Sequence, residues 1–207
     1  MTNQQILKLL NEFKLEELKE KLIAEEAAKQ TGGFKSQVNA IVSYLNKVRK
    51  KDRRKILGNY TEFENNVVFT NSYSMYYIKN EKMKLAIKTA INNTEGKYPD
   101  VSKILEANHI TDTYVEINTK DIKQFIAETK ANNDKKCAVF KFFREDANTG
   151  MKVQAGLSYD MVDDFMRIAS PKNETIKWYY DAYNLYKAYY YEDDNMNIVL
   201  LPVKLSN

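Results

Sequence analysis

Residues 158–180 read SYDMVDDFMRIASPKNETIKWYY, and the spacing of their hydrophobic side chains changes partway along. Up to residue 168 the hydrophobic residues recur every three or four positions, which is typical of one face of an α-helix. Ser158 stands where such a helix needs an N-cap. From residue 175 β-branched and aromatic residues take over, which indicates a strand. This stretch therefore predicts a helix that is followed by a strand.

The same order of elements recurs elsewhere along the chain. A helix followed by three strands occurs at least twice, which predicts an α+β fold built from repeated units. Residues 82–91 fit a helix or a strand. The other expected elements are helices at residues 36–51 and 119–131 and strands at residues 55–63, 66–70, 74–79, 114–117, 138–144, 152–157, 185–191 and 197–205.

Three parts of the chain are predicted to be distinct. Residues 1–33 have hydrophobic residues at helical spacing and form a helical N-terminal extension, which either packs on the rest or docks a partner or a second copy. Residues 34–110 form a first unit and residues 111–207 a second one. A linker is expected at residues 106–112, between the two units.

The composition excludes several classes of protein. Hydrophobic residues make up 43% and charged residues 29% of the 207 residues, as in ordinary globular domains. No hydrophobic run approaches the roughly 20 residues that cross a bilayer. A single cysteine, Cys137, rules out an internal disulfide, and a single histidine, His109, rules out mechanisms that need two imidazoles. We expect a cytoplasmic protein in which Cys137 is buried and His109 lies at the surface.

Nothing in the sequence supports an enzyme class. It has no glycine-rich phosphate loop, no paired-histidine motif and no nucleophile elbow. The carboxylates at residues 163–164 and 192–194 offer metal ligands in principle, although adjacent carboxylates are more often solvated. We therefore expect no catalytic residue, no cofactor and no metal.

Charge and tyrosines are unevenly distributed. The net charge is +4, yet residues 47–55 hold seven basic residues and one acidic residue. Such a run either neutralises phosphates without reading base sequence or is a solvated helix end. The fifteen tyrosines offer stacking surfaces for bases, but Tyr179, Tyr189 and Tyr191 fall at alternate strand positions, which favours packing.

Four segments of the chain resemble segments of the bacterial DNA sliding clamp, the beta subunit of DNA polymerase III. They occur in the clamp's order, and the last one stands at the C-terminal end in both. Residues 70–75 correspond to a T-D-G-H-R-L segment, residues 95–100 to D/E-G-x-F/Y-P-D, and the last segment to Y-V-V-M-P-M-R-L. The segments here are KILGNYTEF (55–63), TNSYSM (70–75), EGKYPD (95–100) and IVLLPVKL (198–205).

The resemblance also has departures. A bacterial clamp has three domains, whereas the resemblance implies that here the helical segment before Gly33 replaces the first domain and that the middle one is shortened. The glycine, histidine and arginine of T-D-G-H-R-L are replaced by Ser72, Tyr73 and Ser74.

The first surface that the resemblance implies is a DNA-facing one. In clamps, helices line the inside of a ring and meet the duplex backbone through lysine and arginine. The corresponding helices are those at residues 36–51, 119–131 and 159–169, of which the third carries repelling carboxylates at Asp160, Asp163 and Asp164. The expected DNA-binding residues are Lys47, Arg49, Lys50, Lys51, Arg53, Lys120, Lys123 and Lys130.

The second implied surface is a pocket for a short apolar and aromatic peptide of a DNA polymerase or another replication protein. A hydrophobic groove with a few backbone groups suits such a motif. The expected peptide-binding residues are Thr70, Ser72, Tyr73, Ser74, Met75, Val199, Leu201, Pro202, Val203 and Lys204.

These surfaces lead to two main hypotheses of function. The first is a processivity factor that encloses duplex DNA as a homo-oligomer, with about three copies closing a ring by analogy with clamps. The alternative is a clamp-derived module that binds or interferes with replication partners without encircling DNA. A weaker third hypothesis is a hydrolase that uses the carboxylate clusters.

Overall fold

The structure is a computed structural model, and it describes residues 34–51, 55–91, 93, 98–107, 111–184 and 186–203. The expected N-terminal extension, Arg53, His109 and Lys204 lie outside these residues. Among the helices described, none has the length and hydrophobicity that a bilayer crossing requires.

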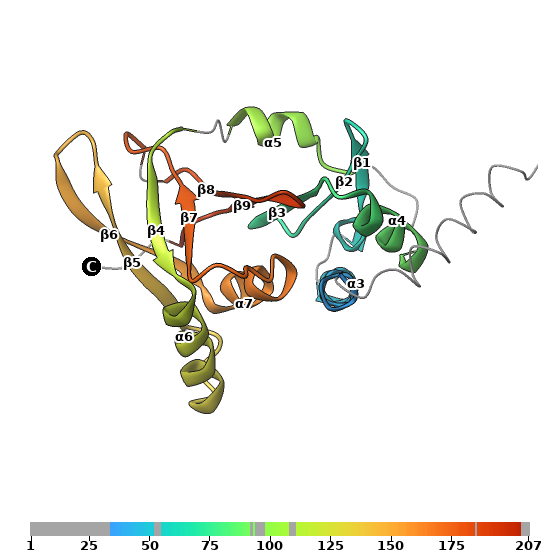
Figure 1. Cartoon of the computed structure of the whole chain (residues 1–207), viewed down its shortest axis with the longest axis horizontal. Helices are drawn as coiled ribbons and strands as arrows, with labels where there is room; N and C mark the ends of the chain where they lie inside the picture. Colours follow the sequence, from blue (N-terminus) through green and yellow to red (C-terminus); the bar gives the residue numbers. More distant parts are fainter. Residues whose placement is uncertain are drawn as a thin grey trace, which may run out of the picture.

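A seven-stranded antiparallel sheet forms the centre of the molecule (Figure 1), and a separate hairpin of β5 and β6 lies beside it. The strand order in the large sheet is β1-β2-β3-β9-β8-β7-β4. The bounds are β1 Thr61–Phe63, β2 Asn66–Thr70, β3 Ser74–Ile78, β4 Tyr114–Asn118, β5 Val139–Asp146, β6 Met151–Ser158, β7 Thr175–Tyr179, β8 Tyr189–Glu192 and β9 Met196–Leu200.

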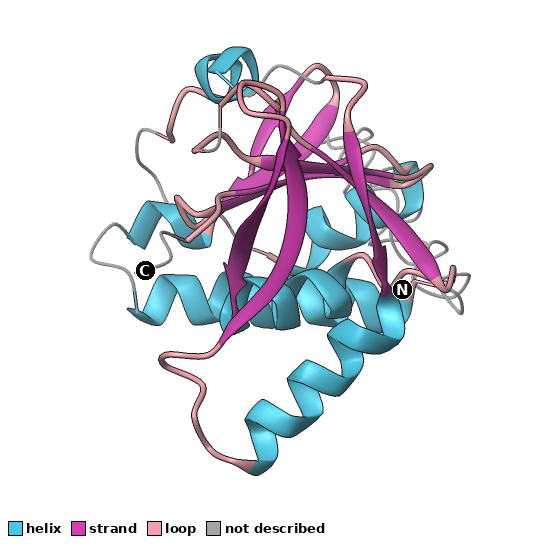
Figure 2. Cartoon of the chain, turned by 90° about the vertical axis from the view of Figure 1, so that its left-hand side faces the viewer, coloured by secondary structure: helices cyan, strands magenta, loops and turns pink. Residues whose placement is uncertain are grey.

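The helices lie on both sides of this sheet. Helices α3, α6 and α7 lie along one side, and the short α5 lies on the opposite side (Figures 1 and 2). Their bounds are α3 Lys35–Lys51, α4 Glu81–Ala90, α5 Val101–Ala107, α6 Thr119–Ala131 and α7 Tyr159–Ile168, with a 3-10 turn, η2, at Lys55–Gly58.

The recurrence expected from the sequence is present. Helix α3 precedes β1, β2 and β3, and α7 precedes β7, β8 and β9, whereas α6 is followed by the two strands of the hairpin. Ser158 caps α7, because its side chain accepts a hydrogen bond from the backbone N–H of Met161. The predicted α+β class is confirmed, and residues 82–91 prove to be mostly helical, as α4.

Contacts on both sides of the molecule join the residues of the first predicted unit to those of the second. In the sheet, β3 pairs with β9 along its whole length, so that Met75 lies opposite Val199. On the helical side, the buried Gln37 of α3 donates from Nε2 to the carbonyl oxygens of Ile168 and Ala169 at 3.1 and 2.9 Å. These bonds satisfy carbonyls that the end of α7 leaves without a helical partner. The sheet is therefore continuous through both units, while their boundaries stay a prediction.

Most of the hydrophobic core lies between the sheet and α3, α6 and α7. Trp178 is fully buried there, with the rings of Phe142 and Phe165 tilted against it at centroid distances of 5.3 and 5.7 Å. Tyr189 and Tyr191 are buried in the same cluster. The alternation of tyrosines along this strand therefore reflects packing, as the sequence favoured.

A smaller hydrophobic cluster lies on the opposite face of the sheet, under α5. Because successive strand residues point to opposite faces, β9 supplies Val199 to it from between two residues that face the larger core, and β3 supplies Met75 and the partly buried Tyr77. Tyr179 packs at its margin. The buried members are Val68, Met75, Val101, Ala188, Tyr190 and Val199.

The strand predicted for residues 55–63 is wrong in its first half. Residues 55–58 form the η2 turn, because the Arg49 guanidinium donates to the Gly58 carbonyl at 3.1 Å and to the Asn59 side chain at 2.9 Å. Glycine is needed at this position, since a Cβ on Gly58 would lie 2.4 Å from the Cβ of Arg49.

Four further expectations need correction. The strand predicted at residues 185–191 begins only at Tyr189, because Asp181 and Asn184 accept backbone N–H groups and hold the preceding residues in turns. The strand predicted at residues 197–205 ends at Leu200, and the linker is shortened by α5. Cys137 is exposed rather than buried, because it lies in the turn between α6 and β5.

Replacing a buried tyrosine should cost far more stability than replacing an exposed one. Tyr189 is fully buried among aromatic rings, whereas Tyr186 is 79% exposed. We expect Tyr189→Ala to lower the free energy of unfolding by about 3–5 kcal/mol, and Tyr186→Ala to change it by no more than about 0.5 kcal/mol. Urea denaturation followed by circular dichroism measures both, and equal losses would contradict the described core.

Candidate functional site

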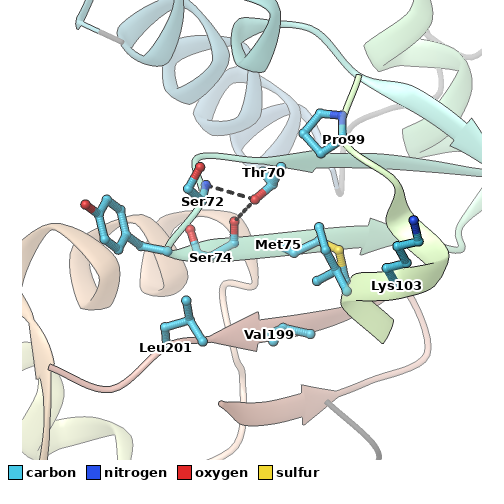
Figure 3. Close-up of a pocket in the computed structure, with 10 residues that line it drawn as sticks. Thr70, Ser72, Ser74, Met75, Pro99, Lys103, Val199 and Leu201 are labelled. Atoms are coloured by element: carbon cyan, nitrogen blue, oxygen red, sulfur yellow. Dashed lines mark hydrogen bonds between the residues drawn. The ribbon is translucent and has the colours of Figure 1, made fainter. Parts of the chain in front are cut away.

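A groove of about 400 Å³ opens where the smaller hydrophobic cluster reaches the end of the sheet (Figure 3). It lies between the turn that joins β2 to β3, the strand β9 with the residue that follows it, and α5. The residues that line it are Thr70, Ser72, Tyr73, Ser74, Met75, Pro99, Lys103, Ile104, Val199 and Leu201.

The floor of the groove is hydrophobic. Met75 and Val199 are direct cross-strand partners, and both are almost completely buried. Just beyond β9, the backbone N–H of Leu201 donates to the carbonyl of Tyr73 at 2.9 Å, which extends the pairing by one residue. The pairing of β3 with β9 therefore creates the floor, since each strand supplies part of it.

One wall of the groove is a tightly bonded turn. Thr70 donates from its hydroxyl to the Ser74 carbonyl at 2.8 Å and accepts the N–H of Ser72 at 3.0 Å, as drawn in Figure 3. Asn71 accepts the N–H groups of Tyr73 and Ser74 through Oδ1. Ser72 has a left-handed backbone with φ of 78°. The turn consequently holds the Tyr73 side chain at the rim, 65% exposed.

The other wall is α5 with the residues just before it. The hydroxyl of Tyr98 accepts the backbone N–H of Thr70 at 2.8 Å, and burial raises the pKa of this phenol, so it stays neutral. Val101 anchors α5 in the small cluster. Lys103 lines the groove with its charged end exposed, and its ammonium lies 3.5 Å from the Asp100 carboxylate. The groove thus combines a hydrophobic floor with a cation at its rim.

Seven of the ten expected peptide-binding residues line this groove, from both strands. Pro202 and Val203 do not, because the chain turns away after Leu201 and the N–H of Val203 donates to the Gly156 carbonyl at 3.0 Å. Lys204 lies outside the described residues. That the groove binds a peptide stays a prediction.

The contribution of α5 to the groove was not predicted. Pro99, Lys103 and Ile104 line it, yet neither a helix nor a strand was expected between residues 91 and 114. The signals present were an aspartate followed by hydrophobic residues three apart. Asp100 indeed accepts the N–H of Ser102, as an N-cap does.

A second candidate surface is the side of the molecule that α3, α6 and α7 cover. Three of its lysines form ion pairs within the chain rather than standing free. Lys47 lies 3.3 Å from Asp160 and 3.6 Å from Asp164. Lys130 lies 2.9 Å from Asp163, and Lys120 lies 2.7 Å from Glu174.

The other expected DNA-binding residues differ in their surroundings. Arg49 is part of the fold through its bonds to Gly58 and Asn59, whereas Lys50 and Lys123 are exposed. The side chain of Lys51 is not among those described, and neither is Arg53. Contact of any of these residues with DNA stays a prediction.

Asp164 is the most strongly perturbed carboxyl group at this surface. Its side chain is only 8% exposed, and burial raises its pKa to about 6 despite the nearby ammonium of Lys47. Burial alone would lower the pKa of Lys47, but the carboxylates of Asp164 and Asp160 outweigh it and raise that pKa. The lysine therefore stays charged while Asp164 titrates in mildly acidic solution.

The carboxylates considered as metal ligands have structural partners. Asp193 accepts the N–H groups of Asn195 and Met196 at 2.8 and 2.9 Å, which shapes the turn into β9. Glu192 pairs with Lys79 at 3.0 Å. Within the described part of the chain, no group of three or more histidine, cysteine, aspartate or glutamate residues is placed to hold a metal ion.

Comparisons with known proteins find a match in structure alone. No protein-family model and no curated protein sequence matches the chain. A Helicobacter pylori beta clamp in complex with 3,4-difluorobenzamide matches with a TM-score of 0.56 and 11% identity, over 81% of this chain and 64% of that one. A Pseudomonas aeruginosa DNA polymerase sliding clamp with a ligand matches with a TM-score of 0.52 and 9% identity, over 82% and 65%.

This likeness establishes the fold. The chain has the fold of bacterial sliding clamps, which confirms what the four sequence segments indicated. It spans less than two thirds of the length of those clamps.

The buried carboxyl group should make stability depend on pH. The folded-state pKa of Asp164 is about 6, above the usual value near 3.9, so the folded protein holds a proton that the unfolded chain has released between these pH values. This contribution to stability is complete below pH 4 and is lost as the pH rises through about 6. The ionisable groups around it are Tyr44 and Lys47 of α3, Tyr76 of β3, and Asp160, Asp163 and Arg167 of α7.

We therefore expect the wild type to lose up to about 3 kcal/mol of stability between pH 4 and 7 relative to Asp164→Asn, which cannot titrate. Urea denaturation at a series of pH values measures this difference. Asp160→Asn is the control. It removes another carboxylate that pairs with Lys47, but this carboxylate is 64% exposed. Parallel pH profiles for the wild type and Asp164→Asn would contradict the expectation.

Proposed function

We propose that this chain is a non-enzymatic, clamp-like module that captures a short hydrophobic segment of a replication protein in the groove between β3, β9 and α5. The observation that carries the proposal is that the groove is complete within one chain. Its floor, its bonded turn and its helical wall all come from described residues, and no second copy is needed to form it.

The shape and chemistry of the groove support a peptide as its ligand. A hydrophobic floor accepts apolar or aromatic side chains, and a few polar groups at the rim orient the backbone. Ser72 supplies a hydroxyl group at one side, while Lys103 supplies a cation at the other. We expect an acidic residue beside the apolar anchors of the bound segment, because its carboxylate would meet Lys103.

A charge placed in the floor should weaken this binding. An ionised carboxylate in an apolar groove must be desolvated, so we expect Leu201→Asp to weaken binding at least about tenfold. The probe is a short fluorescein-labelled synthetic peptide that carries leucine and phenylalanine side chains and one aspartate, and the readout is fluorescence anisotropy.

Met151→Asp is the matched control, because it makes a comparable substitution at an exposed position of β6, outside the groove. This variant should bind the peptide as the wild type does. Equal binding by Leu201→Asp and the wild type, or no binding of any such peptide by the wild type, would remove the groove as the site.

The second candidate function is enclosure of duplex DNA by several copies. It is favoured by the placement of α3, α6 and α7 along one side of the sheet, and by α3, which carries no acidic residue. Because the chain is shorter than the clamps that it matches, a ring would need about three copies.

Light scattering and DNA retention test this second candidate. If the chain closes a ring, the mass in solution should exceed the 24.2 kDa of one chain severalfold. The protein should also stay on nicked circular duplex and slide off the same DNA after linearisation. A monomeric mass at high concentration, with equal retention on both DNA forms, would leave only the peptide-binding function.

A further inference from the structure

Helix α7 stands between two helices that supply lysines to the same surface. It packs against both α3 and α6 (Figure 1). Its acidic residues Asp163 and Asp164 follow Asp160 by three and four positions, so both lie beside Asp160 on the helix surface. Two of them reach Lys47 on α3, and the third reaches Lys130 on α6.

From these ion pairs we infer that the surface of α3, α6 and α7 is a polyanion-binding face whose lysines are neutralised by the carboxylates of α7. The carboxylates of α7 act as internal counter-ions on the lysines of both neighbouring helices. This inference does not rest on the peptide groove, which lies on the other side of the sheet.

Two of the carboxylates on α7 are largely removed from water. The side chains of Asp163 and Asp164 are 17% and 8% exposed, so salt in solution screens their interaction less than that of an exposed pair. Both are held within a packed helix. Lys47 and Lys130 therefore have fixed anionic partners at 2.9–3.6 Å.

An approaching phosphate meets two obstacles at this face. It must displace a carboxylate from each lysine, and it is repelled by the carboxylates that remain nearby. A lysine that is already neutralised by the protein also releases fewer counter-ions from DNA, and this release is the main source of sequence-independent affinity. The wild-type face should therefore hold duplex DNA weakly.

Neutralising the carboxylates should make the lysines of this face available to a polyanion. Lys50 follows Lys47 by three residues on α3, and Lys123 precedes Lys130 by seven residues on α6, so each pair shares a helix face. Both Lys50 and Lys123 are exposed. Freed lysines would join them in one basic surface.

The experiment measures binding of a short linear DNA duplex by the full chain with both Asp160→Asn and Asp163→Asn. We expect at least about tenfold tighter binding than the wild type at low salt, and a salt dependence steeper by at least about one in the log–log plot, since Lys130 is freed to neutralise a phosphate while Lys47 keeps only Asp164. Fluorescence anisotropy at several salt concentrations gives both values. A linear duplex needs no ring, and peptide binding in the groove should not change, so this inference and the proposed function fail separately.

The matched control combines Glu62→Gln with Glu192→Gln. It changes the net charge by the same amount and frees Lys88 of α4 and Lys79, which follows β3, so neither lysine belongs to α3, α6 or α7. The inference is overturned if the α7 variant binds the duplex no tighter than this control, or if adding Lys47→Ala and Lys130→Ala leaves the gain intact. Should the double variant unfold, Asp160→Asn alone affects an exposed side chain and removes one of the two carboxylates on Lys47, so it should still bind the duplex more tightly than the wild type.

Discussion

The pairing of β3 with β9 is the interaction on which the rest of the structure depends. It joins two parts of the chain into one sheet, and it aligns Met75 with Val199 on one face while Tyr76 and Ile198 enter the main core on the other. A shift of one residue would send every one of these side chains to the wrong face. The register that builds the core is therefore the same register that builds the groove.

Much of the fold could be predicted from the sequence, because its long elements have clear hydrophobic periods. The helix at residues 36–51 and the strands around Phe69 and Tyr76 appear nearly where expected. Errors arose where side chains bond to the backbone. Arg49 turns residues 55–58 into a helical turn, and Asp181 and Asn184 delay β8, whereas the sequence pattern reports hydrophobic spacing only.

The residues of the groove could be predicted from the sequence better than the ion pairs between the helices. The strand residues of the groove followed from two resembling segments, but α5 did not, since seven residues offer too little periodicity to identify a helix. The lysines and carboxylates of α3 and α7 were visible as charges, whereas their pairing was not. Lys47 and Asp160 are 113 residues apart, and only the antiparallel packing of the two helices brings them together.

The distance along the chain between β3 and β9 also bears on how the protein is made. Ser74 of β3 lies opposite Leu200 of β9, so more than a hundred further residues must be synthesised before β3 can pair with β9. Contacts between residues so far apart in the chain form slowly. During synthesis we therefore expect β2 and β3 to be present before β9, with the β9-facing edge of β3 unpaired. A product truncated before residue 196 would lack β9 and therefore the groove. Only a chain that has been translated beyond this residue can form the groove.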